Sequence, residues 1–349
     1  MLNPKGISLG ILSLLLIFAG CPSESSGEWL IPEDQVYEGG PGKDGIPALE
    51  NPEFISVSEV DFLSDDDLVI GVKMGDDIRS YPHPILNWHE IINDDINDTY
   101  FSITYCPLTG SGIGWSRTLN GQTTTFGVSG LLYNSNLIPY DRLTDSNWSQ
   151  MMLQCVNGEL IGQYIETAHV IETTWQTWKE MYPESEVVST NTGYDRPYET
   201  YPYGDYKTNH ETLIFPISND DPRLPRKERV HGVIIGNETK VYVINSFPDT
   251  IHTINDNFND VPLVVVGSSS KNFVVTYKRE LADGTILTFE PVQDALPVVM
   301  IDNEGTTWNI FGEAVEGPRQ GARLNPTLSF NSYWFAWGTF YPGAEIYSH

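Results

Sequence analysis

Short apolar segments separated by polar turns run through most of this chain. Residues 100–105 alternate between the two faces of a strand, and Leu119-Asn-Gly-Gln122 between apolar runs predicts a hairpin turn. Apolar residues at helical spacing predict short helices over 84–92 and 173–181, the second stopped by Pro183. The pattern therefore predicts an α+β fold built on mainly antiparallel sheet with short helices.

The pattern occurs twice. Gly71-Val-Lys-Met-Gly75 recurs as Gly232-Val-Ile-Ile-Gly236 at an offset of 161 residues. Further matches, at offsets between 159 and 163, include Trp148 with Trp308, Trp178 with Trp337, and Tyr182-Pro183 with Tyr341-Pro342. Ordered matches of this kind predict two tandem pseudo-symmetric copies, 53–183 and 232–343. The connector between them, 184–231, is rich in aromatic residues and proline, and we expect it to pack over a surface as a lid or clamp.

The N-terminus has the features of a lipoprotein signal peptide. Lys5 precedes the apolar run 7–19, which is shorter than a membrane-spanning helix. Ala19-Gly20 before Cys21 resembles the bacterial lipobox, in which the peptide is cut before a cysteine that then carries lipid. We expect residues 1–20 to be removed, Cys21 to be lipidated, residues 21–50 to form a tether, and the body to be held in the bacterial cell envelope. A plain secretory signal is the alternative.

Composition excludes some classes of function. The chain has 19 Lys and Arg against 47 Asp and Glu, a formal charge of −28. Nucleic acid is therefore not an expected partner, because phosphate binding needs clustered cations. Forty per cent hydrophobic residues, with nine Trp among them, exclude a disordered acidic chain.

Differences between the two copies point to a site in the first. Cys106, which ends an apolar strand and begins a turn with Pro107 and Gly110, faces Ser268 of the second copy. A thiolate at such a turn can be a nucleophile or a ligand for a soft metal; a small buried core residue is the alternative. Cys155 faces Ala314 and is interpreted as a core residue, while a disulfide between Cys106 and Cys155 stays open.

His89, at the end of the first predicted helix, is a candidate base or metal ligand, or a helix-end histidine bonded to backbone carbonyls. His83, flanked by two prolines, is expected in a constrained turn and is the weaker candidate. The loop residues Ser129, Tyr133 and Asn134 can donate hydrogen bonds to a ligand or satisfy a tight turn. The end of the connector, 223–229, is rich in cations that can bind an anion or hold the acidic copies together.

Several motifs together resemble one family. They are Tyr105-Cys-Pro-Leu-Thr-Gly110, Ser129-Gly-Leu-Leu-Tyr-Asn-Ser135, Tyr140-Asp-Arg142, Trp148-Ser-Gln150, Thr173-Thr-Trp175 and Thr192-Gly-Tyr-Asp-Arg-Pro-Tyr198. They resemble the bacterial and archaeal domain-of-unknown-function family numbered 3179, over about residues 50–345. The resemblance implies no established activity. Members commonly carry a second Cys where this chain has Thr109, so a dithiol site is in doubt here. A more distant likeness to copper-chaperone and organomercurial-lyase proteins suggests soft-metal chemistry.

Three functions follow from these features. The first is an envelope lipoprotein with a cleft around Cys106 that binds a soft metal ion such as copper, or a small ligand. Its expected neighbours are His89, Tyr133, Asn134, Arg142 and Arg196. The second is a thiol enzyme with Cys106 as nucleophile, His89 as base and Ser129 or the Gly110–Gly112 backbone stabilising an anion. The third is a non-catalytic surface module that binds glycan or protein.

Overall fold

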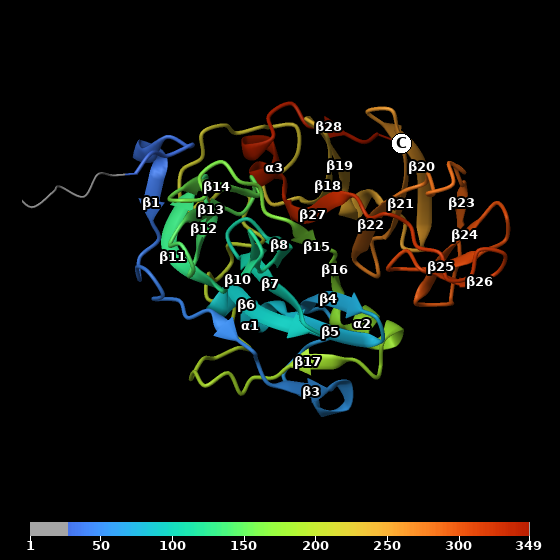
Figure 1. Cartoon of the computed structure of the whole chain (residues 1–349), viewed down its shortest axis with the longest axis horizontal. Helices are drawn as coiled ribbons and strands as arrows, with labels where there is room; N and C mark the ends of the chain where they lie inside the picture. The colour runs from blue at the N-terminus through green and yellow to red at the C-terminus, as the bar shows by residue number, and fades with distance from the viewer. Residues whose placement is uncertain (1–26, 349) are drawn as a thin grey trace, which may run out of the picture.

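The computed structural model describes residues 27–348 and confirms the α+β fold (Figure 1). Strands dominate, and nearly all of their pairings are antiparallel. Three α-helices occur among the described residues, each of seven residues: α1 (His83–His89), α2 (Trp175–Met181) and α3 (Trp334–Phe340). No helix in this part of the chain is long and apolar enough to cross a membrane. Short 3-10 helices lie at Glu33–Gln35, Val57–Glu59 and Ile244–Ser246.

The first half contains three five-stranded sheets and a small hairpin. One sheet has the order β16 (Ile171–Thr174), β4 (Leu68–Met74), β5 (Asp77–Pro82), β17 (Glu186–Val188) and β3 (Phe54–Ser56). The second has β15 (Thr167–Ala168), β8 (Ser111–Ser116), β7 (Thr99–Cys106), β6 (Ile91–Ile96) and β2 (Leu49–Glu50). The third has β1 (Val36–Glu38), β11 (Phe126–Tyr133), β12 (Asn136–Asp141), β13 (Asn147–Ser149) and β14 (Gln154–Asn157). The hairpin pairs β9 (Thr118–Leu119) with β10 (Gln122–Thr123).

The second half forms three sheets, of which β20 to β26 make up the right-hand end of the molecule in Figure 1. The first sheet has the order β27 (Leu328–Tyr333), β18 (Arg229–Ile235), β19 (Glu238–Val243) and β28 (Glu345–Ile346). The second has β20 (His252–Phe258), β21 (Val261–Ser268) and β22 (Phe273–Lys278). The third has β23 (Phe289–Pro291), β24 (Val298–Asp302), β25 (Thr307–Asn309) and β26 (Ala314–Glu316).

The two halves repeat the same strand connections. The hairpin β4–β5 has antiparallel β16 on one side and parallel β17 on the other, and β18–β19 has antiparallel β27 and parallel β28 in the same places. Trp178 lies over Gly71, and Trp337 lies over Gly232 in the same way. The duplication itself stays a prediction, but the strand order that it requires is present in both halves.

Two segments are more ordered than the sequence pattern indicated. Residues 27–50 fall within the expected tether, yet they supply β1, which pairs with β11, and β2, which pairs with β6. β17 lies inside the expected connector and extends the first sheet through its pairing with β5. β1 and β2 are edge strands and β17 lies inside its sheet, but all three have only two or three residues, which is too short for a clear alternation in the sequence.

The predicted helix at 84–92 is also different in the structure. It begins at His83, which we expected in a turn, and ends at His89, after which Ile91 and Ile92 belong to β6. The predicted helix at 173–181 begins instead at Trp175, since the side chain of Thr174 caps it by accepting the backbone NH of Thr177. Periodicity located both elements; three of the four predicted ends are misplaced by one to three residues, and the end at Met181 is correct.

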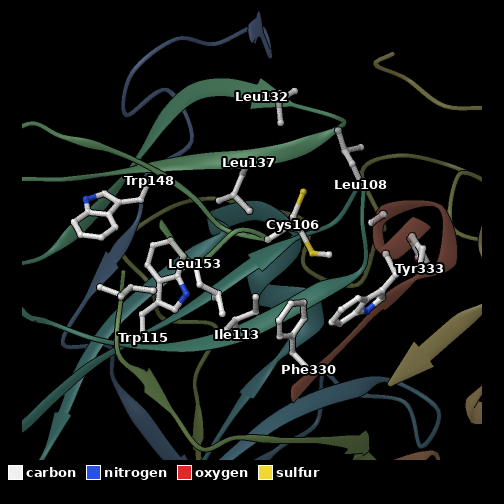
Figure 2. Packing of buried hydrophobic residues seen from close by; sticks show 14 of the residues in the cluster. Cys106, Leu108, Ile113, Trp115, Leu132, Leu137, Trp148, Leu153, Phe330 and Tyr333 are labelled. Atoms are coloured by element: carbon white, nitrogen blue, oxygen red, sulfur yellow. The ribbon is translucent and has the colours of Figure 1, made fainter. Parts of the chain in front are cut away.

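One hydrophobic cluster crosses the boundary between the halves. Figure 2 shows Cys106, Leu108 and Ile113 of the first half packed near Phe330 and Tyr333 of the second. The backbone is joined at the same place, because the NH of Tyr333 donates to the carbonyl of Thr109 at 2.8 Å. The turn after Cys106 is therefore built into the contact between the two halves.

Candidate functional site

Cys106 is the last residue of β7 and lies in the interior, with only 1% of its surface exposed. Its Sγ donates to the carbonyl of Ser135 at 3.7 Å, and the NH of Thr109 donates to the Cys106 carbonyl at 3.3 Å. Most of the surrounding side chains in Figure 2 are apolar. The thiol is thus placed at the end of a rigid strand, beneath the turn that follows it.

Burial raises the pKa of the Cys106 thiol to about 11, and the nearby Glu90 carboxyl contributes to the rise. Contacts with Thr109 and with the backbone of Leu137 lower the pKa, but they do not outweigh burial. The thiol is therefore protonated at neutral pH, and it is not an activated nucleophile in this state.

A cavity of about 60 Å³ lies beside the thiol, and we name it the thiol pocket. Cys106 and Glu90 both line this cavity, and the pKa of each is clearly shifted. The rest of its lining is mostly apolar and comes from residues 39–46, from β11 and β12, and from the connector. Its lining residues include Ile46, Leu108, Val128, Leu132, Leu137, Tyr203 and Phe215.

Glu90 follows the last residue of α1 and adopts a left-handed backbone conformation, with φ of 57°. Such a conformation is costly for a residue other than glycine and often marks a functional position. Its backbone is fixed on both sides, since its NH donates to Leu86 and its carbonyl accepts from Tyr105. Its side chain is turned to the thiol pocket, while only 8% of the residue is exposed.

The Glu90 carboxyl has no hydrogen-bond or ion-pair partner among residues 27–348. Burial raises its pKa to about 8, so the group is neutral at pH 7. Sequence reasoning missed Glu90, although it lies next to His89 in the chain. The predicted helix, 84–92, runs through Glu90, so the hydrophobic pattern did not indicate the chain reversal that turns this side chain.

His89 is held away from the thiol by other partners. Its Nδ1 lies 2.8 Å from the carbonyl of Pro47, and its Nε2 lies 2.7 Å from the hydroxyl of Tyr198. Burial lowers the pKa of His89, and the charge of Arg196 contributes. The sequence placed His89 beside Cys106, whereas the structure uses it to fix residue 47 and the connector against α1.

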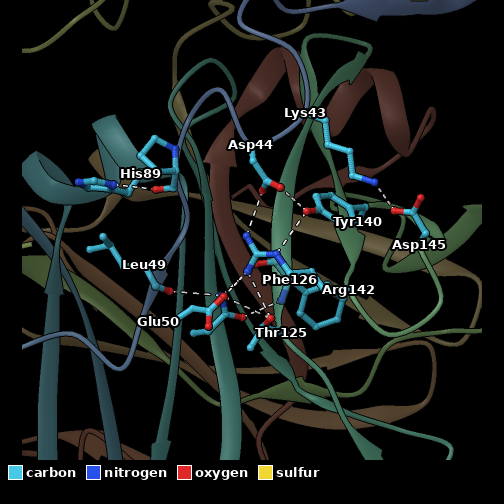
Figure 3. A network of polar contacts seen from close by, with 12 residues as sticks. Lys43, Asp44, Leu49, Glu50, His89, Thr125, Phe126, Tyr140, Arg142 and Asp145 are labelled. Atoms are coloured by element: carbon cyan, nitrogen blue, oxygen red, sulfur yellow. Dashed lines mark hydrogen bonds and ion pairs between the residues drawn. The ribbon is translucent and has the colours of Figure 1, made fainter. Parts of the chain in front are cut away.

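The two arginines expected near Cys106 also lie elsewhere. Figure 3 shows Arg142 between Asp44 and Glu50, with its Nε 3.3 Å from the hydroxyl of Tyr140. This network fastens the segment before β2 to β12 and borders a separate, open cavity of about 630 Å³. Arg196 donates to the carbonyl of Asp195 at 3.3 Å and does not line the thiol pocket.

The loop residues serve the backbone and the connector. Ser129 accepts the NH of Leu131 and donates to the carbonyl of Ile138, which satisfies an irregularity in β11. Asn134 has φ of 51°, as the tight turn between β11 and β12 requires, and its Oδ1 accepts the NH of Ser218 at 2.7 Å. The ring of Tyr133 packs edge-on against Phe340. None of the three lines the thiol pocket.

Cys155 is a buried core residue with no exposed surface, in agreement with its sequence interpretation. Its Sγ donates to the carbonyl of Asn157 at 3.4 Å, and burial raises its pKa to about 11. Cys106 and Cys155 are both free thiols. Cys21, the predicted lipidation site, lies outside the described residues. Across residues 27–348, no three His, Cys, Asp or Glu side chains are grouped so as to hold a metal ion.

Comparison with known proteins gives one match. A family model described as "Protein of unknown function (DUF3179)" matches residues 43–344, which is nearly the whole chain. No curated protein and no solved structure matches the chain.

Proposed function

Because the chain belongs to the DUF3179 family, whose function is unknown, we propose its function from geometry: a lipid-anchored envelope protein that binds a small neutral ligand in the thiol pocket. The ligand has an apolar body and one hydrogen-bond acceptor. The observation that carries this proposal is the unpartnered Glu90 carboxyl, which lines the same cavity as Cys106.

A buried carboxyl without a partner is unusual, because burial of an unsatisfied polar group costs about 1–3 kcal/mol. The raised pKa of Glu90 keeps the group protonated, so it presents an OH donor to the pocket at neutral pH. A ligand with a carbonyl or ether oxygen would accept this hydrogen bond. A carboxylate ligand would instead carry its charge into an apolar cavity, which is strongly unfavourable.

The size and lining of the pocket limit the ligand. A volume of about 60 Å³ corresponds to roughly four or five water-sized positions, so a molecule of about four to six non-hydrogen atoms fits. The Cys106 thiol supports the same chemistry, since a protonated, polarisable sulfur packs well against an apolar ligand. A soft metal ion such as copper is the alternative occupant, and it would require Cys106 and Glu90 to release their protons.

The anchor rests on the sequence alone. The apolar run 7–19, the Ala19-Gly20 pair and Cys21 support cleavage and lipidation. The acidic body supports an anchor made of acyl chains rather than a basic membrane-binding surface. Together with the pocket, these features favour a ligand-binding lipoprotein over a thiol enzyme, since His89, the proposed base, has both ring nitrogens bonded to other groups.

The proposal is tested by labelling Cys106 in the full-length protein with methyl methanethiosulfonate, a small neutral reagent. Cys21 is replaced by serine, so that Cys106 and Cys155 are the two thiols present. We expect one label, on Cys106, detected by mass spectrometry, and no label on Cys155, which does not line the thiol pocket. Butanone, an apolar molecule with one acceptor, should slow the labelling, whereas butyrate at equal concentration should not. Copper and zinc ions are tested in the same assay.

Two variants control the experiment. Cys106→Ala should remove the label, and Glu90→Leu should keep the label but abolish protection by butanone. Protection by butyrate as strong as by butanone, or protection unchanged in Glu90→Leu, would refute the assignment of the ligand. Protection by a metal ion but not by butanone would replace the neutral ligand with the metal.

A further inference from the structure

A second and larger cavity, of about 350 Å³, lies on the other side of the turn that follows β7, and we name it the polar cleft. Tyr105 lines the polar cleft while Cys106 lines the thiol pocket, as expected for neighbouring residues of one strand, which point to opposite faces. Both halves and the connector contribute to it. Its lining includes His83, Asn87, Tyr201, Lys207, Lys227, Arg229, Asn272 and Tyr333.

A histidine supported by a carboxylate lines one wall of the polar cleft. Nε2 of His83 lies 3.1 Å from Oε2 of Glu172, and both side chains are more than nine-tenths buried. The distance between the two atoms suits an ion pair, but their geometry does not meet the criteria for a hydrogen bond. Such contacts in ligand-free sites often tighten when the ligand binds.

Glu172 is held firmly as an anion. Burial alone would raise its pKa, but Arg229 and His83 outweigh this effect and lower the pKa to about 2. Arg229 pairs with Oε1 of Glu172, and Nδ2 of Asn331 donates to the same oxygen at 3.1 Å. The contact with Glu172 orients the His83 ring, with Nε2 toward the carboxylate and Nδ1 on the opposite edge of the ring.

Nδ1 of His83 has no hydrogen-bond partner among the described residues. The ring packs on Tyr105, with the two centroids 4.3 Å apart, which fixes its plane at the edge of the cavity. Asn87, also in the lining, has a buried Oδ1 without a partner. The polar cleft therefore holds one buried acceptor without a partner, Asn87 Oδ1, and a histidine nitrogen that can exchange a hydrogen bond with a ligand hydroxyl.

Cations lie on the other side of the polar cleft. Lys227 is only 4% exposed, and its Nζ donates to the backbone carbonyls of Tyr206 and Thr212 without any described ion pair. Lys207 is exposed and likewise has no described ion pair. Arg229 also lines the cavity, and it forms an ion pair with Glu172. Asp66, Asp67 and Glu199 line the same cavity, and Arg229 is shared with Glu172, so the place for a negative group is beside Lys207 and Lys227.

The remaining lining favours a hydroxylated ligand over a simple anion. Asp66 and Asp67 also face the polar cleft, and carboxylates there accept hydrogen bonds from neutral hydroxyls while repelling a second negative charge. Tyr201 and Tyr333 supply aromatic surface. We propose that the polar cleft binds an acidic monosaccharide: its carboxylate lies beside Lys207 and Lys227, and its hydroxyls form hydrogen bonds with His83, Asn87 and the aspartates.

The volume agrees with this ligand, because pockets for small molecules begin at about 300 Å³. The site is independent of the ligand proposed for the thiol pocket, which is neutral, apolar and much smaller. The two proposals can therefore fail separately.

The test is isothermal titration of the full-length protein with three probes. Glucuronate carries both the charge and the hydroxyls, glucose has the hydroxyls alone, and acetate has the charge alone. We expect glucuronate to bind at least about tenfold more tightly than either of the others. Equal affinity for all three probes, or no binding of glucuronate, would overturn the proposal.

Four variants locate the site. His83→Gln removes the ring nitrogen Nδ1 that exchanges a hydrogen bond with the ligand, and should weaken glucuronate binding about tenfold. Lys207→Ala, at an exposed position that does not affect folding, should weaken glucuronate binding at least about threefold and leave glucose unchanged. Lys278→Ala, an exposed lysine on β22 outside the cleft, and Lys43→Ala, an exposed lysine that also lies outside it, should bind glucuronate as the wild type does. Wild-type affinity in both His83→Gln and Lys207→Ala would place the sugar elsewhere.

Discussion

Glu172 and Asn331 hydrogen-bond to each other from matching places in the two halves. Each lies three residues before the first tryptophan of a short helix, Trp175 in α2 and Trp334 in α3, and Nδ2 of Asn331 donates to Oε1 of Glu172 at 3.1 Å. The first half thus has a carboxylate where the second has an amide. This difference gives the contact between the halves one buried charge, which is paired with Arg229 and lies beside His83.

Glu172→Gln should lower the free energy of unfolding at pH 7 by about 3 kcal/mol, because it leaves Arg229 without its buried partner. The folded pKa of Glu172, about 2, is below the ordinary value of 4.5, so its stabilising effect is present above pH 4.5 and is lost as the pH falls toward 2. Urea unfolding between pH 2 and 7 should show the two proteins converging at low pH. The exposed Glu180, paired with Lys271, provides the control: Glu180→Gln should change stability by less than about 1 kcal/mol throughout.

Glu90 should have the opposite pH dependence. Its folded pKa, about 8, is above the ordinary value of 4.5, so the neutral form favours folding and stability is lost as the pH rises from 4.5 to 8. Glu90→Gln cannot ionise, and its stability relative to the wild type should therefore increase through this range, by at most about 5 kcal/mol. A difference between the two proteins that does not change with pH would show that the carboxyl is ionised at no cost.

Both described cysteines should resist charged reagents. Cys106 and Cys155 are buried, and burial raises the pKa of each to about 11. Alkylation by iodoacetate at pH 7.5 should therefore be at least about a hundredfold slower in the folded protein than in urea. Cys106→Ser should cost about 1–3 kcal/mol, the usual effect of burying a poorly partnered hydroxyl. Fast alkylation of Cys106 alone would indicate an open site around a reactive thiol.

Two buried glycines at matching places, Gly71 and Gly232, test the equivalence of the copies. A Cβ at Gly71 would lie 1.9 Å from the ring of Trp178, and a Cβ at Gly232 would lie 2.0 Å from the ring of Trp337. Gly71→Ala and Gly232→Ala should each destabilise the protein by about 3 kcal/mol through overpacking. Gly75→Ala meets no atom within 4 Å and has only its positive φ to oppose it, so its cost should be about 1 kcal/mol. Unequal effects at Gly71 and Gly232 would argue against equivalent packing.

The anchor is tested at Cys21. Cys21→Ser should abolish acyl labelling and move the protein from the membrane fraction to the soluble fraction, because the acyl chains on Cys21 are the proposed anchor. Retention of the variant in the membrane fraction would refute lipidation of Cys21.

The sequence by itself determined the class of fold and the place of several strands and helices. Alternation over residues 100–105 located β7, and the turn at Asn120 and Gly121, both with positive φ, joins β9 and β10. These features are local, since they depend on side-chain period and on residues that tolerate a left-handed backbone. Trp178 and Trp337, which the repeat pattern matched, are both fully buried and lie in the short helices α2 and α3.

Only the tertiary structure decided which groups surround Cys106. His89 and Glu90 are adjacent in the chain, yet the left-handed backbone at Glu90 turns its carboxyl to the thiol pocket while His89 bonds to Pro47 and Tyr198. Glu172 reaches His83 through the pairing of β16 with β4, across about 90 residues of sequence. Periodicity reports which face of an element is buried, but the partner of a buried polar group depends on packing between distant elements, which hydrophobic pattern does not encode.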